Sequence, residues 1–262
     1  MSRPFEIYFA YVRRCILAFI QFRADALISV FSILISQFAA FVAVWAISRA
    51  IGDIGGWHFY DLTLVFSIFI IISALNQIFF DGVWNIGNVY VRRGMLDVLL
   101  TRPIPVLAQV ICQRMEIGAI SLAIAGASLL GYSLFMLDIS VTLYTVLIIM
   151  LFIICGVAIS TSLYLIANSI NFWLVQGNEI ADLVQLVQEF SRYPMGVFPT
   201  GIRLVFTFIM PFAFATYYPA SILTGRMPGQ AIWFVLLAAV ACVAAAAFVW
   251  CKGVKSYNGT GS

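Results

Sequence analysis

The sequence predicts an all-α membrane protein that crosses the bilayer several times. Hydrophobic residues make up 63% of its 262 residues and charged residues only 10%, whereas soluble globular domains carry about 25% charged residues. The mean hydropathy is +1.05. Since each span needs about 20 apolar residues, the chain accommodates six spans with short loops and leaves little room for a soluble catalytic domain. We therefore expect a single membrane domain over residues 1–262.

The first 24 residues predict a helix that lies in the plane of the membrane surface. Apolar residues such as Phe5, Val12 and Phe19 recur at helical spacing, while Arg13 and Arg14 fall mostly on the other side. A basic amphipathic helix of this kind lies among the lipid headgroups, with its basic face towards anionic lipid. A plain cytoplasmic tail is the alternative. A signal peptide is not expected, because the stretch lacks a clean apolar region and a small-residue cleavage site.

Five apolar runs predict membrane spans. They are expected at about residues 26–47, 62–80, 106–130, 141–167 and 231–250. A short glycine-containing loop separates the first two, and its Trp57 and Tyr60 suit the headgroup layer. Arginines and lysines gather in the segments on the same side as the N-terminus, so the positive-inside rule places both termini in the cytoplasm.

Residues 168–229 allow two assignments. Four polar residues share a stripe of one helix: Gln176, Glu179, Asp182 and Gln185. Pro194 and Pro199 break the helix after this stripe, and Pro211 and Pro219 interrupt the apolar segment that follows. Either the polar stripe lines a cavity as part of a fifth span and the broken segment is re-entrant, or the stripe lies on the cytoplasmic surface and the broken segment is the span. Both assignments give six spans.

The polar stripe supplies the candidate substrate pathway. Ionisable groups at membrane depth are costly and are therefore usually functional. If the stripe lies at that depth, Gln176, Glu179, Asp182 and Gln185 line the pathway, and its acidic members favour a cationic or amphipathic substrate. A solvated cytoplasmic face is the alternative.

Residues 89–102, VYVRRGMLDVLLTR, predict a helix of about three turns on the cytoplasmic side between the second and third spans. Four apolar residues can share one of its faces: Val91, Met95, Val98 and Leu99. Pro103 and Pro105 end it, because neither donates a backbone hydrogen bond. The helix is too short to cross a bilayer. Its residues leave two interpretations open, an interfacial turn held by snorkelling arginines or a docking element for a soluble partner.

The sequence shows no pattern for catalysis or metal binding. Its one histidine, His58, falls in an outer loop, and the five cysteines lack metal-ligand spacing. It contains no G-x-x-x-x-G-K-[ST] phosphate loop, so ATP chemistry would have to come from another chain. We expect no metal and no cofactor in this chain, and no nucleic-acid partner. An ion- or proton-coupled secondary transporter is the alternative class, although such carriers often show internal repeats that are not visible here.

Residues 89–110 resemble the segment after the second span in permease subunits of type-2 ABC exporters. One branch of that family shares the pattern R-x-G-x-L-D-x-x-L-x-R-P. Here its residues are Arg92, Gly94, Leu96, Asp97, Leu100, Arg102 and Pro103. The C-terminal end resembles the same branch through Trp250, Gly253, Lys255, Tyr257 and Gly261. Residues 193–225 are similar to its proline-rich segment, and the order of these parts matches over essentially the whole chain.

The resemblance implies a division of labour between chains. In such exporters two permeases, identical or paralogous, form the pathway. Two ATPase subunits bind ATP and Mg and drive transport from the cytoplasm. Residues 89–102 would then be the coupling helix that rests in a groove of the ATPase. Its contact residues would be Arg92, Arg93, Met95, Leu96, Asp97, Leu99, Leu100 and Arg102.

The same resemblance implies roles for both flanking regions. The N-terminal helix would help to transmit motion. Residues 194–225 would form short re-entrant helices that gate the outer face, with Pro194, Pro199, Pro211 and Pro219 at their breaks. The expected location is the bacterial inner membrane, with membrane lipid as a further partner.

Overall fold

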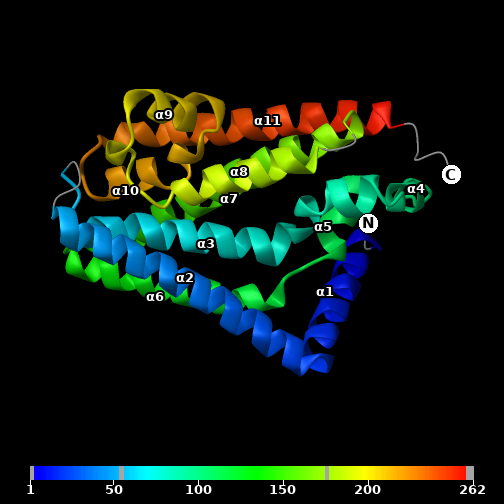
Figure 1. Cartoon of the computed structure of the whole chain (residues 1–262), viewed down its shortest axis with the longest axis horizontal. Helices are drawn as coiled ribbons and strands as arrows, with labels where there is room; N and C mark the ends of the chain where they lie inside the picture. Colours follow the sequence, from blue (N-terminus) through cyan, green and yellow to red (C-terminus); the bar gives the residue numbers. More distant parts are fainter. Residues whose placement is uncertain (1–2, 53–55, 175–176, 258–262) are drawn as a thin grey trace.

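The computed structural model describes residues 3–52, 56–174 and 177–257, and no strand occurs among them. Five helices in that part of the chain are long and apolar enough to cross a membrane, and a bent helix pair gives a sixth span if it is counted as one. The five helices are α2 (Arg23–Ile51), α3 (Phe59–Trp84), α6 (Ile120–Met136), α7 (Leu143–Ser169) and α11 (Ile232–Ser256). The expected all-α, polytopic fold is therefore confirmed (Figure 1).

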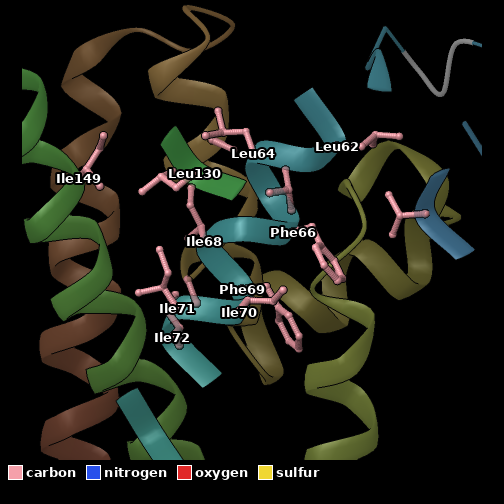
Figure 2. Close-up of a cluster of buried hydrophobic side chains, with 14 of the residues drawn as sticks. Leu62, Leu64, Phe66, Ile68, Phe69, Ile70, Ile71, Ile72, Leu130 and Ile149 are labelled. Atoms are coloured by element: carbon pink, nitrogen blue, oxygen red, sulfur yellow. The ribbon is translucent and has the colours of Figure 1, made fainter. Parts of the chain in front are cut away.

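Helix α3 is the central element of the bundle and packs against α6 and α7. Its buried side chains from Leu62 to Ile72 form half of the main apolar cluster, and Figure 2 shows Leu130 of α6 and Ile149 of α7 among them. Gly156 lets α7 approach α3 closely, because a Cβ at this position would collide with the side chain of Ile72 on α3. By contrast, α2 exposes most of its apolar side chains, as suits a helix that faces lipid or another chain.

The second span is longer than the sequence predicted. Instead of ending at Phe80, the helix is kinked there and continues to Trp84, and a π-helical segment, η1 (Ile86–Val91), follows it. The short helix expected over residues 89–102 is accordingly reduced to α4 (Met95–Leu100). Gly82 does not end the α-helix, because it is buried against Val110 of α5, and the helix ends only at its C-cap, Asn85.

The third span begins later than predicted. Val106–Gln113 forms a separate helix, α5, and the span starts with a 3-10 turn, η2 (Ile117–Ala119), that leads into α6. Between them Arg114 has an extended backbone. The segment between α5 and η2 is attached to α3, because Arg114 pairs with Asp81 and the Glu116 N–H donates to the carbonyl of Gln77.

Different helices and connections lie at the two ends of the bundle. At one end, called the terminal end here, lie α1 (Arg3–Gln21), α4, α5 and the C-terminal end of α11, and α1 runs at a steep angle to the long helices (Figure 1). At the opposite, distal end lie the connection between α2 and α3 and the short helices α9 (Thr200–Leu204) and α10 (Tyr217–Leu223) (Figure 1).

Residues 170–231 form one short helix that lines a cavity and a bent helix pair, and this arrangement is compatible with either of the two assignments. After η3 (Ile170–Phe172), helix α8 (Asn178–Phe190) packs on α7 and runs beside the long helices (Figure 1). At about 20 Å, it is too short to cross a bilayer by itself. The chain continues through η4 (Met195–Val197), α9, η5 (Val205–Ile209), η6 (Phe212–Phe214), α10 and η7 (Gly229–Ala231). The stretches 200–209 and 212–223 meet at a bend of 79°.

Candidate functional site

A polar cavity of about 400 Å³ lies between α2, α3, α7 and α8. Four helices supply its polar lining: Ser36, Gln37, Ser73, Asn76, Gln77, Asp81, Thr161, Tyr164, Gln185, Gln188 and Glu189. The rings of Phe80 and Trp84 complete the wall on the α3 side. Its volume lies within the range of about 300–1,000 Å³ that is usual for ligand pockets.

Much of this cavity lies at membrane depth. A hydrocarbon core of about 30 Å corresponds to about 20 residues of a straight helix, so a span that starts at Phe59 leaves the core near residue 80. Ser73, Asn76 and Gln77 precede that point, and Asp81 lies at its edge. Because polar groups at that depth are costly, their gathering around one cavity marks a candidate transport site.

Hydrogen bonds fix part of the cavity wall and leave two buried atoms unpaired. The hydroxyl of Thr161 donates to Asn76 Oδ1 at 2.6 Å, and the hydroxyl of Tyr164 donates to Gln188 Oε1. Within the described chain, Asn76 Nδ2 and Gln37 Oε1 are buried without a hydrogen-bond partner. Buried polar atoms are rarely left in this state, so each is a candidate contact for a polar molecule in the cavity.

Both carboxylates of the cavity wall are paired with arginines. Asp81 Oδ2 lies 2.5 Å from Arg114 Nε, and Glu189 forms an ion pair with Arg192. The guanidinium of Arg192 also lies over the ring of Phe69, 5.0 Å from its centroid. The charges of the wall are thus compensated within the protein.

The predicted pathway residues only partly coincide with the cavity. Gln185 lines it, whereas Glu179 and Asp182 are exposed residues of α8 outside the lining. Gln176 lies outside the described residues. The helical stripe instead continues from Gln185 to Gln188 and Glu189.

Sequence reasoning missed the contribution of the long spans to this cavity. The sequence does contain a signal for this contribution, because hydroxyl and amide side chains interrupt otherwise apolar runs at Ser36 and Gln37 and again from Ser73 to Gln77. Such groups within a span are functional candidates by the same argument that singled out α8.

At the terminal end, α4 forms the tip of the molecule (Figure 1). It follows a turn at Gly94, whose φ of 67° suits glycine. Leu96 and Leu99 are buried against the chain's own core, so the predicted shared apolar face is divided. The exposed residues at this tip include Arg92, Arg93, Met95, Asp97, Val98, Leu100 and Arg102. Of these, Val98 was not among the predicted contact residues.

Side-chain hydrogen bonds tie α4 to two neighbouring helices. The amide of Gln109, on α5, donates to the carbonyl of Leu99 at 3.0 Å and to that of Ile104 at 2.8 Å. Arg102 donates to the hydroxyl of Tyr11, on α1, at 3.1 Å. These bonds connect α4 and the residues that follow it to α5 and α1.

At the distal end, prolines mark the breaks between short helices. Pro194 and Pro199 precede η4 and α9, and Pro211 lies at the 79° bend. Pro219 lies in the first turn of α10, where its missing N–H would have had no helical partner. Pro194 and Pro219 are buried, Pro211 is half-buried and Pro199 is exposed.

The distal end is also closed by a charged contact between distant segments. Arg226 pairs with Asp61 at 2.6 Å, donates to the carbonyl of Gly56 and lies 4.4 Å from the centroid of the Trp57 ring. This contact joins the start of α3 to the connection between α10 and α11.

Comparison with known families gives one match. A family model described as "ABC-2 family transporter protein" matches residues 34–261, which include the cavity, α4 and the distal short helices. No curated protein and no solved structure matches the chain.

Proposed function

Because the chain belongs to the ABC-2 transporter family and is a membrane permease of an ABC transporter, we propose that it provides the substrate pathway of an exporter. Two separate ATPase subunits would drive this transport by binding and hydrolysing ATP with Mg. A second permease, identical or paralogous, would complete the complex. The proposed location is the bacterial inner membrane, with both termini in the cytoplasm.

The observation that carries the proposal is the exposed tip of α4 and its attachment. Met95 and Val98 are apolar yet about half exposed, and Arg92 and Arg93 beside them are exposed too. An apolar tip with basic neighbours suits a groove in a soluble partner. Its position at the terminal end makes it accessible to an ATPase in the cytoplasm (Figure 1).

A continuous set of contacts leads from this tip to the cavity. Gln109 connects the end of α4 to α5, and α5 packs on α3, which carries Asn76 and Asp81 of the cavity wall. Closure of the ATPase pair would favour one arrangement of α4 and α5, and the cavity would follow as a shift between two populations. This is how ATP binding outside the membrane would change access to the substrate site.

The test is capture of the cognate ATPase by a Met95→Ser/Val98→Ser variant. Because both side chains are exposed, the variant should fold normally, whereas changes at the buried Leu96 and Leu99 would disturb the core. We expect ATPase capture to fall at least tenfold and ATP-driven transport to fall with it. Val141→Ser is the matched control, since Val141 is an exposed apolar residue between α6 and α7 at the distal end. Unchanged capture and transport in the double variant would show that α4 is not the docking element.

A further inference from the structure

We infer that the polar cavity binds an uncharged molecule rich in hydroxyl or amide groups and selects against charged analogues. The inference rests on the proposed transport function, because it names the substrate class of that same site. It replaces the cationic substrate that the acidic stripe of α8 indicated, since Glu179 and Asp182 lie outside the lining.

The first argument is the charge of the wall. Its two carboxylates, Asp81 and Glu189, are already paired with Arg114 and Arg192. A cationic substrate would have to compete with these arginines, and an anionic one would meet carboxylates first. Either charged molecule would lose part of its hydration without gaining a free counter-charge, and that loss is costly.

The second argument is the hydrogen-bonding capacity of the wall. Five carboxamides line it: Gln37, Asn76, Gln77, Gln185 and Gln188. A carboxamide offers both donors and an acceptor, and this combination matches hydroxyl and amide groups rather than an ion. Two atoms of the set, Asn76 Nδ2 and Gln37 Oε1, are one donor and one acceptor that are buried without a partner in the described chain. A site that leaves such atoms unpaired rejects analogues that cannot satisfy them.

The third argument is the aromatic edge. Trp84 and Phe80 lie on the cavity wall beside the carboxamides. The ring of Trp84 is fixed by an edge-to-face contact with Tyr164, with 4.7 Å between centroids. A rigid ring next to hydrogen-bonding groups can cover the apolar face of a sugar ring or the flat face of a peptide unit. Both are uncharged sources of the same chemistry.

Three probes on one ring scaffold test the charge selection. They are N-acetylglucosamine, which is uncharged, glucosamine, which is a cation, and glucuronate, which is an anion. Binding of each radiolabelled probe is measured on the full-length chain in lipid nanodiscs, without ATPase or ATP. A neutral capped dipeptide, N-acetyl-seryl-glycinamide, distinguishes a peptide source from a sugar source. We expect at least one uncharged probe to bind at least tenfold more tightly than either charged probe.

Variants connect this binding to the cavity. Gln77→Leu should weaken binding of the uncharged probe about tenfold, because Gln77 lines the cavity and Leu keeps its approximate size. Gln230→Leu is the matched control, since Gln230 is exposed at the distal end in η7. Arg114→Gln should leave Asp81 unpaired and raise the affinity for glucosamine about tenfold relative to the uncharged probe. The melting temperature of each variant is measured to check that it remains folded.

The outcomes separate this inference from the proposed function. Tightest binding of glucosamine or glucuronate to the unaltered chain would overturn it, as would the absence of binding by both uncharged probes. Equal binding by Gln77→Leu and the unaltered chain would place the ligand elsewhere and overturn it too. None of these results depends on the ATPase. Failure of the α4 variants to impair ATPase capture would instead refute the coupling proposal and leave the binding result intact.

Discussion

At the terminal end of the molecule Arg92 and Arg93 are exposed, whereas at the distal end Arg226 is held by Asp61 and by the ring of Trp57. A similar contrast separates two apolar residues of α4 from two of the distal prolines. Met95 and Val98 of α4 are exposed at the terminal end, while Pro194 and Pro219 are buried among the short helices of the distal end. At these positions the tip of α4 presents basic and apolar side chains at the surface, whereas the distal contact is made within the chain.

The comparison also shows where rigidity is needed. In the proposed mechanism, the tip of α4 transmits a displacement only if α5 is held firmly against α3. The distal contact, in contrast, must hold two segments 165 residues apart in the chain in one conformation. Loss of the contact between α3 and α5 should therefore produce a different defect from loss of the distal contact.

The largest effect is expected from Gly82→Ala, which disrupts the attachment of α5 to α3. A Cβ at this position would collide with the carbonyl oxygen of Val110, which cannot move without shifting α5. Overpacking of this kind costs about 3 kcal/mol. We expect a lower melting temperature in detergent together with weaker ATPase capture, because α4 loses its correct position.

The control for this variant is Gly131→Ala in α6. A Cβ at Gly131 meets nothing within 4 Å, and alanine favours a helix by up to about 1 kcal/mol over glycine. This control should be as stable as the unaltered chain or slightly more so. If Gly82→Ala behaved in the same way, the close contact between α3 and α5 would not be a constraint on the fold.

A smaller effect, at the opposite end, is expected from Arg226→Gln. The substitution leaves the carboxylate of Asp61, which is 4% exposed, without its cation and with the N–H of His58 as a remaining partner. Because Arg226 is itself partly exposed, we expect a loss of about 2 kcal/mol, below the cost for a fully buried pair. Thermal unfolding measures the loss, and ATPase capture should stay normal.

Arg203→Gln is the matched control at the distal end. Arg203 is exposed on α9 and has only a long hydrogen bond, at 3.4 Å, to the carbonyl of Phe198. The Arg203→Gln variant should therefore unfold at the same temperature as the unaltered chain. Reduced ATPase capture in Arg226→Gln would contradict the separation of roles between the two ends.

The sequence predicted the class of fold because hydropathy depends on composition over long runs. It could not locate the ends of α3 and α6. In the sequence pattern Asp81 marked the end of the second span, and Arg114 and Glu116 fell inside the predicted third span. In the structure Asp81 and Arg114 pair where α3 and α5 meet, and Glu116 accepts a hydrogen bond from Ser29 of α2. Such long-range pairing decides where a helix stops, and spacing along the chain does not reveal it.

The candidate site was predicted in part for a related reason. The stripe on α8 identified one wall of the cavity at Gln185, but its other walls come from α2, α3 and α7. Which apolar span turns its few polar residues towards α8 depends on how the helices pack. The division of the α4 face has the same origin, because Leu99 and Val98 are neighbours in sequence and only packing shows which one is buried.

The smallest effect, and the sharpest test of transmission at the terminal end, is expected from Tyr11→Phe. The variant removes the hydroxyl that accepts a hydrogen bond from Arg102 and leaves the ring in place. Because Arg102 is exposed, stability should change by less than about 0.5 kcal/mol. If α1 shares the movement of α4, the loss of one weak hydrogen bond should still lower transport-coupled ATP hydrolysis about twofold. Tyr144→Phe is the control, because Tyr144 is exposed at the distal end in the first turn of α7. Equal hydrolysis rates in both variants would mean that α4 acts through α5 without α1.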